Sequence, residues 1–170
     1  MKNVLSVVLP AAVVLAPAAL AGEVAPQLPA AIAAPGQTVV AALHAEGAQI
    51  HECSPAADGK LVWQVREPIA TLLLAGKTVG RHYAGPTWEY IDGSLVVGRV
   101  VAIVFGATPN DVPWLRLDVV RRQGSGMLSG VTTVQRINTK GGAAQGSCDS
   151  AGSYLSVPYS ADYVFLGKGA

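Results

Sequence analysis

One short segment, residues 82–90, carries the side chains of this sequence that are best suited to acid–base chemistry. It reads HYAGPTWEY and places His82 and Glu89 on either side of a Gly-Pro turn. If the two flanking strands pair across that turn, the imidazole and the carboxylate can come into contact. Such a pair could transfer protons, because imidazole titrates near neutral pH and a carboxylate can fix its orientation. The alternative is structural: Tyr83 and Trp88 pack in the core, and His82 forms a hydrogen bond with a backbone carbonyl group.

A second aromatic and polar segment, VPYSADYVF at residues 157–165, lies near the C-terminus. Its residues Asp162 and Tyr163 can join the first segment if their strand runs beside it. Aromatic faces with polar tips suit a sugar or another flat ligand, and the three tryptophans of the chain could complete such a pocket. Core packing is the alternative explanation for the aromatic residues. The candidate site therefore comprises His82, Tyr83, Trp88, Glu89, Asp162 and Tyr163.

Nitrogen and oxygen ligands for a metal ion are present, but their spacing follows no known pattern. They are His44, His51, Glu52, His82 and Glu89. Neighbours such as His51 and Glu52 face opposite sides of a strand, whereas a catalytic metal site needs three ligands that converge. The glycines and serines at residues 124–130 also lack the helix that follows a hydrolase nucleophile. The sequence therefore predicts no metal and no cofactor, and a small enzyme or metalloprotein that uses His82 and Glu89 is kept as the alternative function.

The N-terminal residues 1–21, MKNVLSVVLPAAVVLAPAALA, have the features of a cleaved signal peptide. A cation precedes an apolar stretch, which ends in the small-x-small pattern that signal peptidase accepts. We expect cleavage after Ala21 and a secreted or periplasmic protein. A membrane anchor is the alternative, but Pro10 and Pro17 interrupt the stretch, which barely reaches the length of a span. No later apolar run is long enough to cross a bilayer, so we expect no membrane span after cleavage.

The composition limits the partners of the exported part. The chain has 170 residues, of which 51% are apolar and 14% charged, and this composition suits one globular domain and not a disordered tail. Its 12 basic and 11 acidic residues provide no large excess of positive charge, which argues against nucleic-acid binding. The remaining partners are a small molecule, a glycan or a surface. The leading hypothesis is a ligand-binding or surface-associated module.

The sequence contains two cysteines, Cys53 and Cys148. An even number in an oxidising compartment predicts one disulfide bond, which would stabilise the fold by about 4 kcal/mol through loop closure. Two free thiols or a reactive cysteine nucleophile are the alternatives. No histidine or cation is arranged around either cysteine in a pattern that would activate it.

Turn residues and the spacing of apolar residues predict an all-β fold. Residues 22–36 are rich in alanine and proline and predict an extended arm, which precedes a single domain at residues 37–170. Short apolar runs follow, and the Asp58-Gly59 and Asp92-Gly93 pairs between them are strong hairpin signals. At residues 114–119, apolar and polar residues alternate with the period of a strand. We expect an antiparallel β-sandwich or a partly closed β-barrel of about eight to ten short strands.

Several of these segments also resemble one protein family, in the same order along the chain. They are HYAGPTWE (82–89), VVGRVVA (96–102), VPWLRLDV (112–119), GMLSGVTTVQRINTKGG (126–142) and VPYSADYVF (157–165). Over residues 48–165 the chain is similar to the secreted bacterial and fungal proteins of the "domain of unknown function 3455" family. The resemblance implies an exported all-β domain, whose members commonly carry cysteines at the two positions found here. It implies no reaction, because the family has no established activity.

Overall fold

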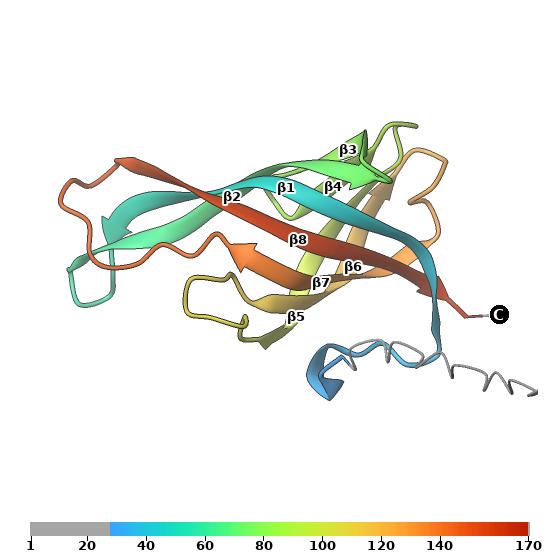
Figure 1. Ribbon diagram of the computed structural model, residues 1–170, viewed down its shortest axis with the longest axis horizontal. Helices are drawn as coiled ribbons and strands as arrows, with labels where there is room; N and C mark the ends of the chain where they lie inside the picture. The colour runs from blue at the N-terminus through green and yellow to red at the C-terminus, as the bar shows by residue number, and fades with distance from the viewer. Residues whose placement is uncertain (1–27, 170) are drawn as a thin grey trace, which may run out of the picture.

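The structure, a computed structural model, describes residues 28–169 and contains eight antiparallel strands in one closed barrel (Figure 1). The prediction of an all-β fold is confirmed, and the strands form a ring rather than the two sheets of a sandwich. The signal peptide expected at residues 1–21 lies outside the described residues. The elements are η1 (Ala30–Ile32), β1 (Gln37–Pro55), β2 (Leu61–Leu74), β3 (Lys77–Tyr83), β4 (Thr87–Tyr90), β5 (Leu95–Val104), β6 (Trp114–Gln123), β7 (Val131–Gly141) and β8 (Tyr154–Lys168).

The strands follow one another around the barrel in chain order. Each strand pairs with the next, and β8 closes the ring by pairing with β1. Both predicted hairpin turns are present, because Asp58-Gly59 joins β1 to β2 and Asp92-Gly93 joins β4 to β5. The two glycines have φ values of 81° and 82°, a conformation in which glycine avoids the steric cost that a side chain would meet.

Three strands are longer than the short strands expected from the sequence. These are β1 with 19 residues, β2 with 14 and β8 with 15. Gly47 stays within β1 and lets β2 approach so closely that a Cβ atom there would lie 2.1 Å from the Ile69 carbonyl oxygen. Pro68 lies in a part of β2 that has no β3 partner, since β3 pairs with β2 only from Ala70 onward. Proline is tolerated at such an edge, so it does not end the strand.

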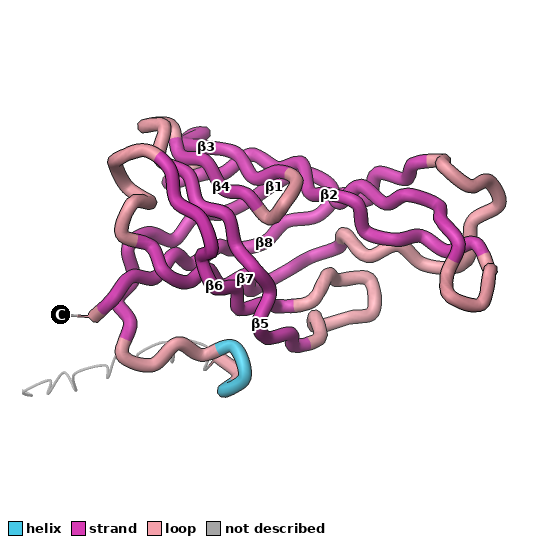
Figure 2. The backbone as a smooth tube through the Cα atoms, turned by 180° about the vertical axis from the view of Figure 1, so that it is seen from behind, coloured by secondary structure: helices cyan, strands magenta, loops and turns pink. Residues whose placement is uncertain are grey.

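The strands β1, β2 and β8 continue past the ring as a three-stranded ribbon (Figure 2). The segment between β7 and β8 folds back along this ribbon, and a disulfide bond between Cys53 and Cys148 attaches it to β1. The disulfide prediction is therefore confirmed. The Cα atoms of the two cysteines are 5.9 Å apart, and no cysteine of the described chain is free.

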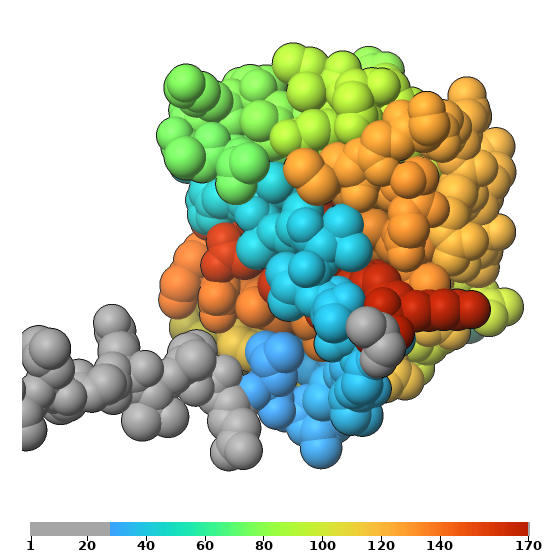
Figure 3. All heavy atoms as spheres, turned by 90° about the vertical axis from the view of Figure 1, so that its right-hand side faces the viewer, coloured from blue at the N-terminus to red at the C-terminus, as the bar shows by residue number. Residues whose placement is uncertain are grey.

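Apolar side chains fill the barrel and alternate along the strands with residues that face outward. One end is closed by the β6–β7 loop, residues 124–130, whose Leu128 is fully buried. Asp92 in the β4–β5 turn holds this loop, because its Oδ2 accepts a hydrogen bond from the Met127 N–H at 2.7 Å. Figure 3 views this end of the barrel, where the loop (orange) meets the β4–β5 turn (yellow-green). The largest fully buried core side chains include those of Trp88, Tyr163, Phe165, Leu43, Leu72 and Leu117.

Residues 28–36, the described part of the expected arm, dock on the outer face of the barrel. Ile32 in the 3-10 turn η1 is fully buried. Its carbonyl oxygen accepts a hydrogen bond from Gln135 Nε2 at 2.6 Å, and that of Ala33 accepts one from Arg116 Nη1 at 2.9 Å. These bonds hold the segment over β6 and β7. Within residues 28–169, no helix is long and apolar enough to cross a membrane.

Candidate functional site

A pocket of about 220 Å³ enters the barrel beside the β3–β4 turn. This turn is at the opposite end of β4 from the turn that contains Asp92, so the pocket lies away from the closed end of the barrel. Seven of the eight strands contribute to its wall. The lining residues are Gln49, Val65, Arg66, Glu67, Pro68, His82, Gly85, Pro86, Trp88, Leu115, Leu117, Arg136 and Tyr163.

His82 forms part of the inner wall as a neutral imidazole. It is paired with Trp88 across the β3–β4 hairpin, and the two rings stack with centroids 4.5 Å apart and planes 4° from parallel. Its Nδ1 donates a hydrogen bond to the Thr87 carbonyl oxygen at 2.8 Å. Burial lowers the pKa of His82 from 6.5 to about 3, because the charged form would lose its hydration. The ring therefore remains uncharged at neutral pH.

Two tyrosines from β8 lie next to this aromatic pair. Tyr163 meets the rings of His82 and Trp88 edge-on, with centroids 4.9 and 5.3 Å away. Its hydroxyl lies 3.4 Å from that of Tyr159, which is also buried. Burial raises the pKa of both phenols, so both stay protonated and neutral.

Arg136 brings a positive charge to the pocket from β7. Its cross-strand partner is Leu115, so the register places both side chains on the inner face. Arg136 Nε donates a hydrogen bond to the Pro113 carbonyl oxygen at 3.0 Å. Burial raises the pKa of Tyr163, and the positive charge of the nearby Arg136 guanidinium partly offsets this rise. Among residues 28–169, no carboxylate lies within 4.0 Å of the guanidinium.

Two further groups of the pocket wall have unused hydrogen-bonding capacity. Gln49 is 2% exposed and Trp88 is 1% exposed. Gln49 Nε2 and Trp88 Nε1 have no hydrogen-bond partner in the described part of the protein. Most buried polar groups are paired, and an unpaired donor costs about 1–3 kcal/mol. His51 Nδ1, Trp114 Nε1 and Arg116 Nε are also unpaired among the described residues but do not line the pocket, so such unpaired atoms are not specific to it.

The family comparison matches the greater part of this barrel. The model of the family described as "Protein of unknown function (DUF3455)" matches residues 73–167, which is more than half of the chain. The chain belongs to the DUF3455 family. No curated protein and no solved structure matches it. The match begins later than the resemblance at residues 48–165, and it includes His82, Trp88 and Arg136 but not Gln49.

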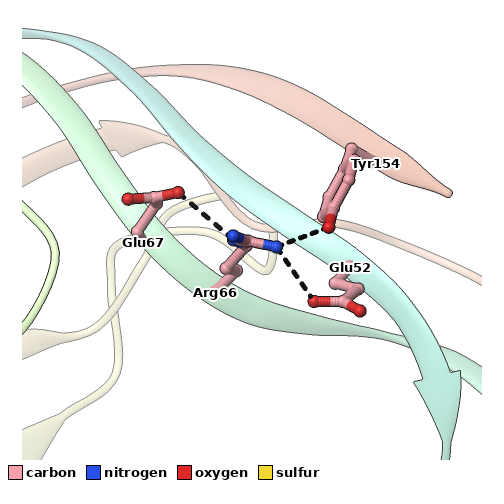
Figure 4. Close-up of polar contacts among 4 residues, drawn as sticks. All are labelled: Glu52, Arg66, Glu67 and Tyr154. Atoms are coloured by element: carbon pink, nitrogen blue, oxygen red, sulfur yellow. Dashed lines mark hydrogen bonds and ion pairs between the residues drawn. The ribbon is translucent and has the colours of Figure 1, made fainter. Parts of the chain in front are cut away.

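The rim of the pocket in this DUF3455 chain carries a second arginine whose charge is balanced. Arg66 on β2 lies between two carboxylates, with its Nε 3.2 Å from Glu67 and its Nη1 3.4 Å from Glu52 on β1 (Figure 4). Its Nη1 also donates a hydrogen bond to the Tyr154 hydroxyl on β8. The cluster links the three strands of the ribbon. Of the two arginines that line the pocket, Arg136 is the one with no carboxylate of residues 28–169 within 4.0 Å.

The DUF3455 barrel separates the two residues that were expected to form a proton-transfer pair. In the β3–β4 hairpin, His82 is opposite Trp88 on the inner face, whereas Glu89 is opposite Arg81 on the outer face. Glu89 Oε2 accepts hydrogen bonds from Arg81 Nη2 at 2.8 Å and from the Tyr83 hydroxyl at 3.0 Å. These bonds, that from Arg81 above all, lower the pKa of Glu89. His82 instead bonds to a backbone carbonyl group, as the structural alternative expected.

Asp162 also lies on the outer face of the barrel. It accepts hydrogen bonds from His44 Nδ1 and from Asn138 Nδ2, both at 2.8 Å. Of the six candidate residues, the pocket therefore contains His82, Trp88 and Tyr163. Within residues 28–169, no group of three or more histidine, cysteine, aspartate or glutamate side chains is placed to hold a metal ion.

Gln49 and Arg136 were not predicted from the sequence as site residues. Each precedes an isoleucine in its strand, and the polar residue of such a pair normally faces water. Gln49 is an even number of residues from Ala45 and Leu43 in β1, so it faces the same side of the strand. Both of those residues are buried, and this spacing could have indicated that Gln49 points inward.

Proposed function

We propose that this DUF3455 protein binds a small organic molecule inside its barrel. The observation that carries the proposal is the pocket of about 220 Å³, which combines an apolar wall, including Leu115 and Leu117, with the charged side chain of Arg136. Binding sites of small molecules have this composition, with a few polar groups set in an apolar wall. An apolar cavity of about 150 Å³ admits benzene, so this pocket suits a single substituted ring better than an oligosaccharide.

The arrangement favours binding over acid–base catalysis. His82 is neutral, is stacked on Trp88 and already donates its Nδ1 proton to a backbone carbonyl oxygen. Glu89 lies on the other face of the sheet, where it is paired with Arg81. Neither residue has the partner that the proton-transfer hypothesis requires.

The test uses the indole N–H signals of the three tryptophans in a ¹H–¹⁵N NMR spectrum, with the Trp88 signal assigned from a Trp88→Phe variant. Benzyl alcohol serves as a neutral single-ring probe. We expect it to shift the Trp88 signal in a saturable manner. A Leu115→Phe variant, which fills the pocket, should weaken this binding, whereas the control Val120→Phe changes an exposed residue of the same strand and should not.

Two results would contradict the proposal. The first is a Trp88 signal that does not respond to the probe in the wild-type protein. The second is binding that survives in Leu115→Phe with unchanged affinity, since the probe would then lie elsewhere on the surface.

We also propose that the protein is exported, and this part of the proposal has a separate test. The signal sequence expected at residues 1–21 and the disulfide bond support a secreted or periplasmic location, because disulfides persist in oxidising compartments. We expect the mature protein from its native host to begin at Gly22, directly before the Ala/Pro-rich segment to residue 36 and the domain at 37–170. Recovery of the uncleaved chain from the cytoplasm would contradict this location.

A further inference from the structure

We propose that the molecule bound in the barrel carries a carboxylate, and that Arg136 holds it. This inference rests on the proposed function and adds the chemical class of the ligand. Its first support is the charge balance of the pocket wall. Arg66 is paired with Glu67 and Glu52, and His82 and Tyr163 are neutral. Arg136 therefore contributes the one positive charge of the wall that no carboxylate within 4.0 Å in residues 28–169 balances.

The second support is the geometry of the Arg136 side chain. Its Nε is engaged by the Pro113 carbonyl oxygen, which fixes the plane of the guanidinium. The two terminal NH₂ groups lie toward the Tyr163 hydroxyl, and no carboxylate of residues 28–169 lies within 4.0 Å of them. Such a planar fork matches the two oxygens of a carboxylate and can bind them with two parallel hydrogen bonds.

The third support is the apolar wall beside Arg136. Leu115, its cross-strand partner, and Leu117 both line the pocket, and they suit an aromatic or aliphatic body attached to the carboxylate.

The experiment compares benzoate with benzyl alcohol, two probes with the same ring that differ in charge. Both are titrated at pH 7 into the full folded protein, and binding is followed at the Trp88 indole signal. We expect benzoate to bind more tightly than benzyl alcohol. In Arg136→Met the benzoate affinity should fall by about tenfold to a hundredfold, the range that follows from about 1.5–3 kcal/mol for hydrogen bonds to a charged group. The affinity for benzyl alcohol should change little.

The matched control is Arg122→Met. Arg122 also donates its Nε to a backbone carbonyl group, that of Val131, but it lies outside the pocket wall. Its replacement removes the same charge from the protein and should leave benzoate binding unchanged. Arg136→Lys keeps the charge without the fork, so it should lose part of the affinity. It also provides a second test if Arg136→Met does not fold.

The possible outcomes separate the two proposals. If benzyl alcohol binds in the pocket but benzoate binds no more tightly, the ligand-binding function stands and the carboxylate inference is overturned. Benzoate binding that is equal in wild type, Arg136→Met and Arg136→Lys overturns the role of Arg136 in the same way. If neither probe binds to the wild-type protein, both proposals fail together.

Discussion

Because His82 is buried and neutral, the free energy of unfolding should depend on pH, and this dependence tests whether the histidine is buried as described. Burial lowers the pKa of His82 from 6.5 to about 3 in the folded protein. The unfolded chain binds a proton at this histidine below pH 6.5, whereas the folded protein does not until the pH approaches 3. Folding stability due to this group is therefore fully present above pH 6.5 and is lost as the pH falls. The loss is about 1.4 kcal/mol per pH unit, which gives about 3 kcal/mol at pH 4.5.

The perturbation that isolates this effect is His82→Phe. Phenylalanine retains a ring that can stack on Trp88 but cannot titrate, and it leaves the Thr87 carbonyl oxygen without its donor. At pH 7 we expect the variant to be less stable than the wild-type protein by about 2 kcal/mol because of that lost hydrogen bond. At pH 4.5 the wild-type protein has lost about 3 kcal/mol that the variant keeps. The order of stability should therefore reverse.

Urea unfolding at pH 7 and pH 4.5 measures both free energies. Carboxylates such as Asp92, whose pKa is lowered by its hydrogen bond from Ser94, also weaken the fold in acid. They are present in both proteins, so the difference between the two proteins reports His82 alone. A gap between wild type and His82→Phe that is the same at both pH values would refute the reasoning, because it would mean that the folded protein protonates His82 freely.

Three further predictions concern the stability of other parts of the fold. Replacing Cys53 and Cys148 with serine should lower the free energy of unfolding by about 4 kcal/mol, and reductant should then have no further effect on unfolding. Gly126→Ala should cost about 2 kcal/mol in chemical unfolding, because the residue has a φ of 143° and a Cβ atom would lie 2.2 Å from the aspartate oxygen that holds the loop. The control Gly130→Ala, with open space around it, should cost much less. Ile32→Ala should cost about 2–4 kcal/mol and expose the docked segment to proteolysis, since Ile32 is fully buried.

The sequence predicted those features of the fold that depend on neighbouring residues, namely two hairpin turns and the inward face of one strand. Aspartate–glycine pairs marked two hairpin turns because few other residues accept their backbone conformation, and the alternation in residues 114–119 placed Leu115 and Leu117 correctly on one face. Closure into a ring was not predictable in this way, because it depends on the pairing of β1 with β8 from opposite ends of the chain. Strand length was also missed, since Gly47 and Pro68 look like breaks until their neighbours are known.

The register of the β3–β4 hairpin places two of the six candidate residues, Tyr83 and Glu89, outside the pocket. The three residues between β3 and β4 place His82 opposite Trp88, and Glu89 is therefore one position away on the other face. Because side chains alternate along a strand, a shift by one residue exchanges all inner and outer positions. Composition could identify the hairpin that carries the site, but only the pairing of the strands determines which of its side chains enter the barrel.

The proposed ligand would account for the charged side chain that the wall of the pocket keeps. A barrel of this size can be filled by apolar side chains alone, and a partly buried charge without a partner costs free energy that a methionine of similar length would not. Arg136 is such a charge, since it lines the pocket and no carboxylate of residues 28–169 lies within 4.0 Å of its guanidinium. At the closed end, by contrast, the polar side chain of Asp92 has its hydrogen bonds satisfied by Ser94 and Met127. On our proposal the two regions differ because the closed end completes the fold, whereas the pocket keeps the charge of Arg136 for an acidic ligand.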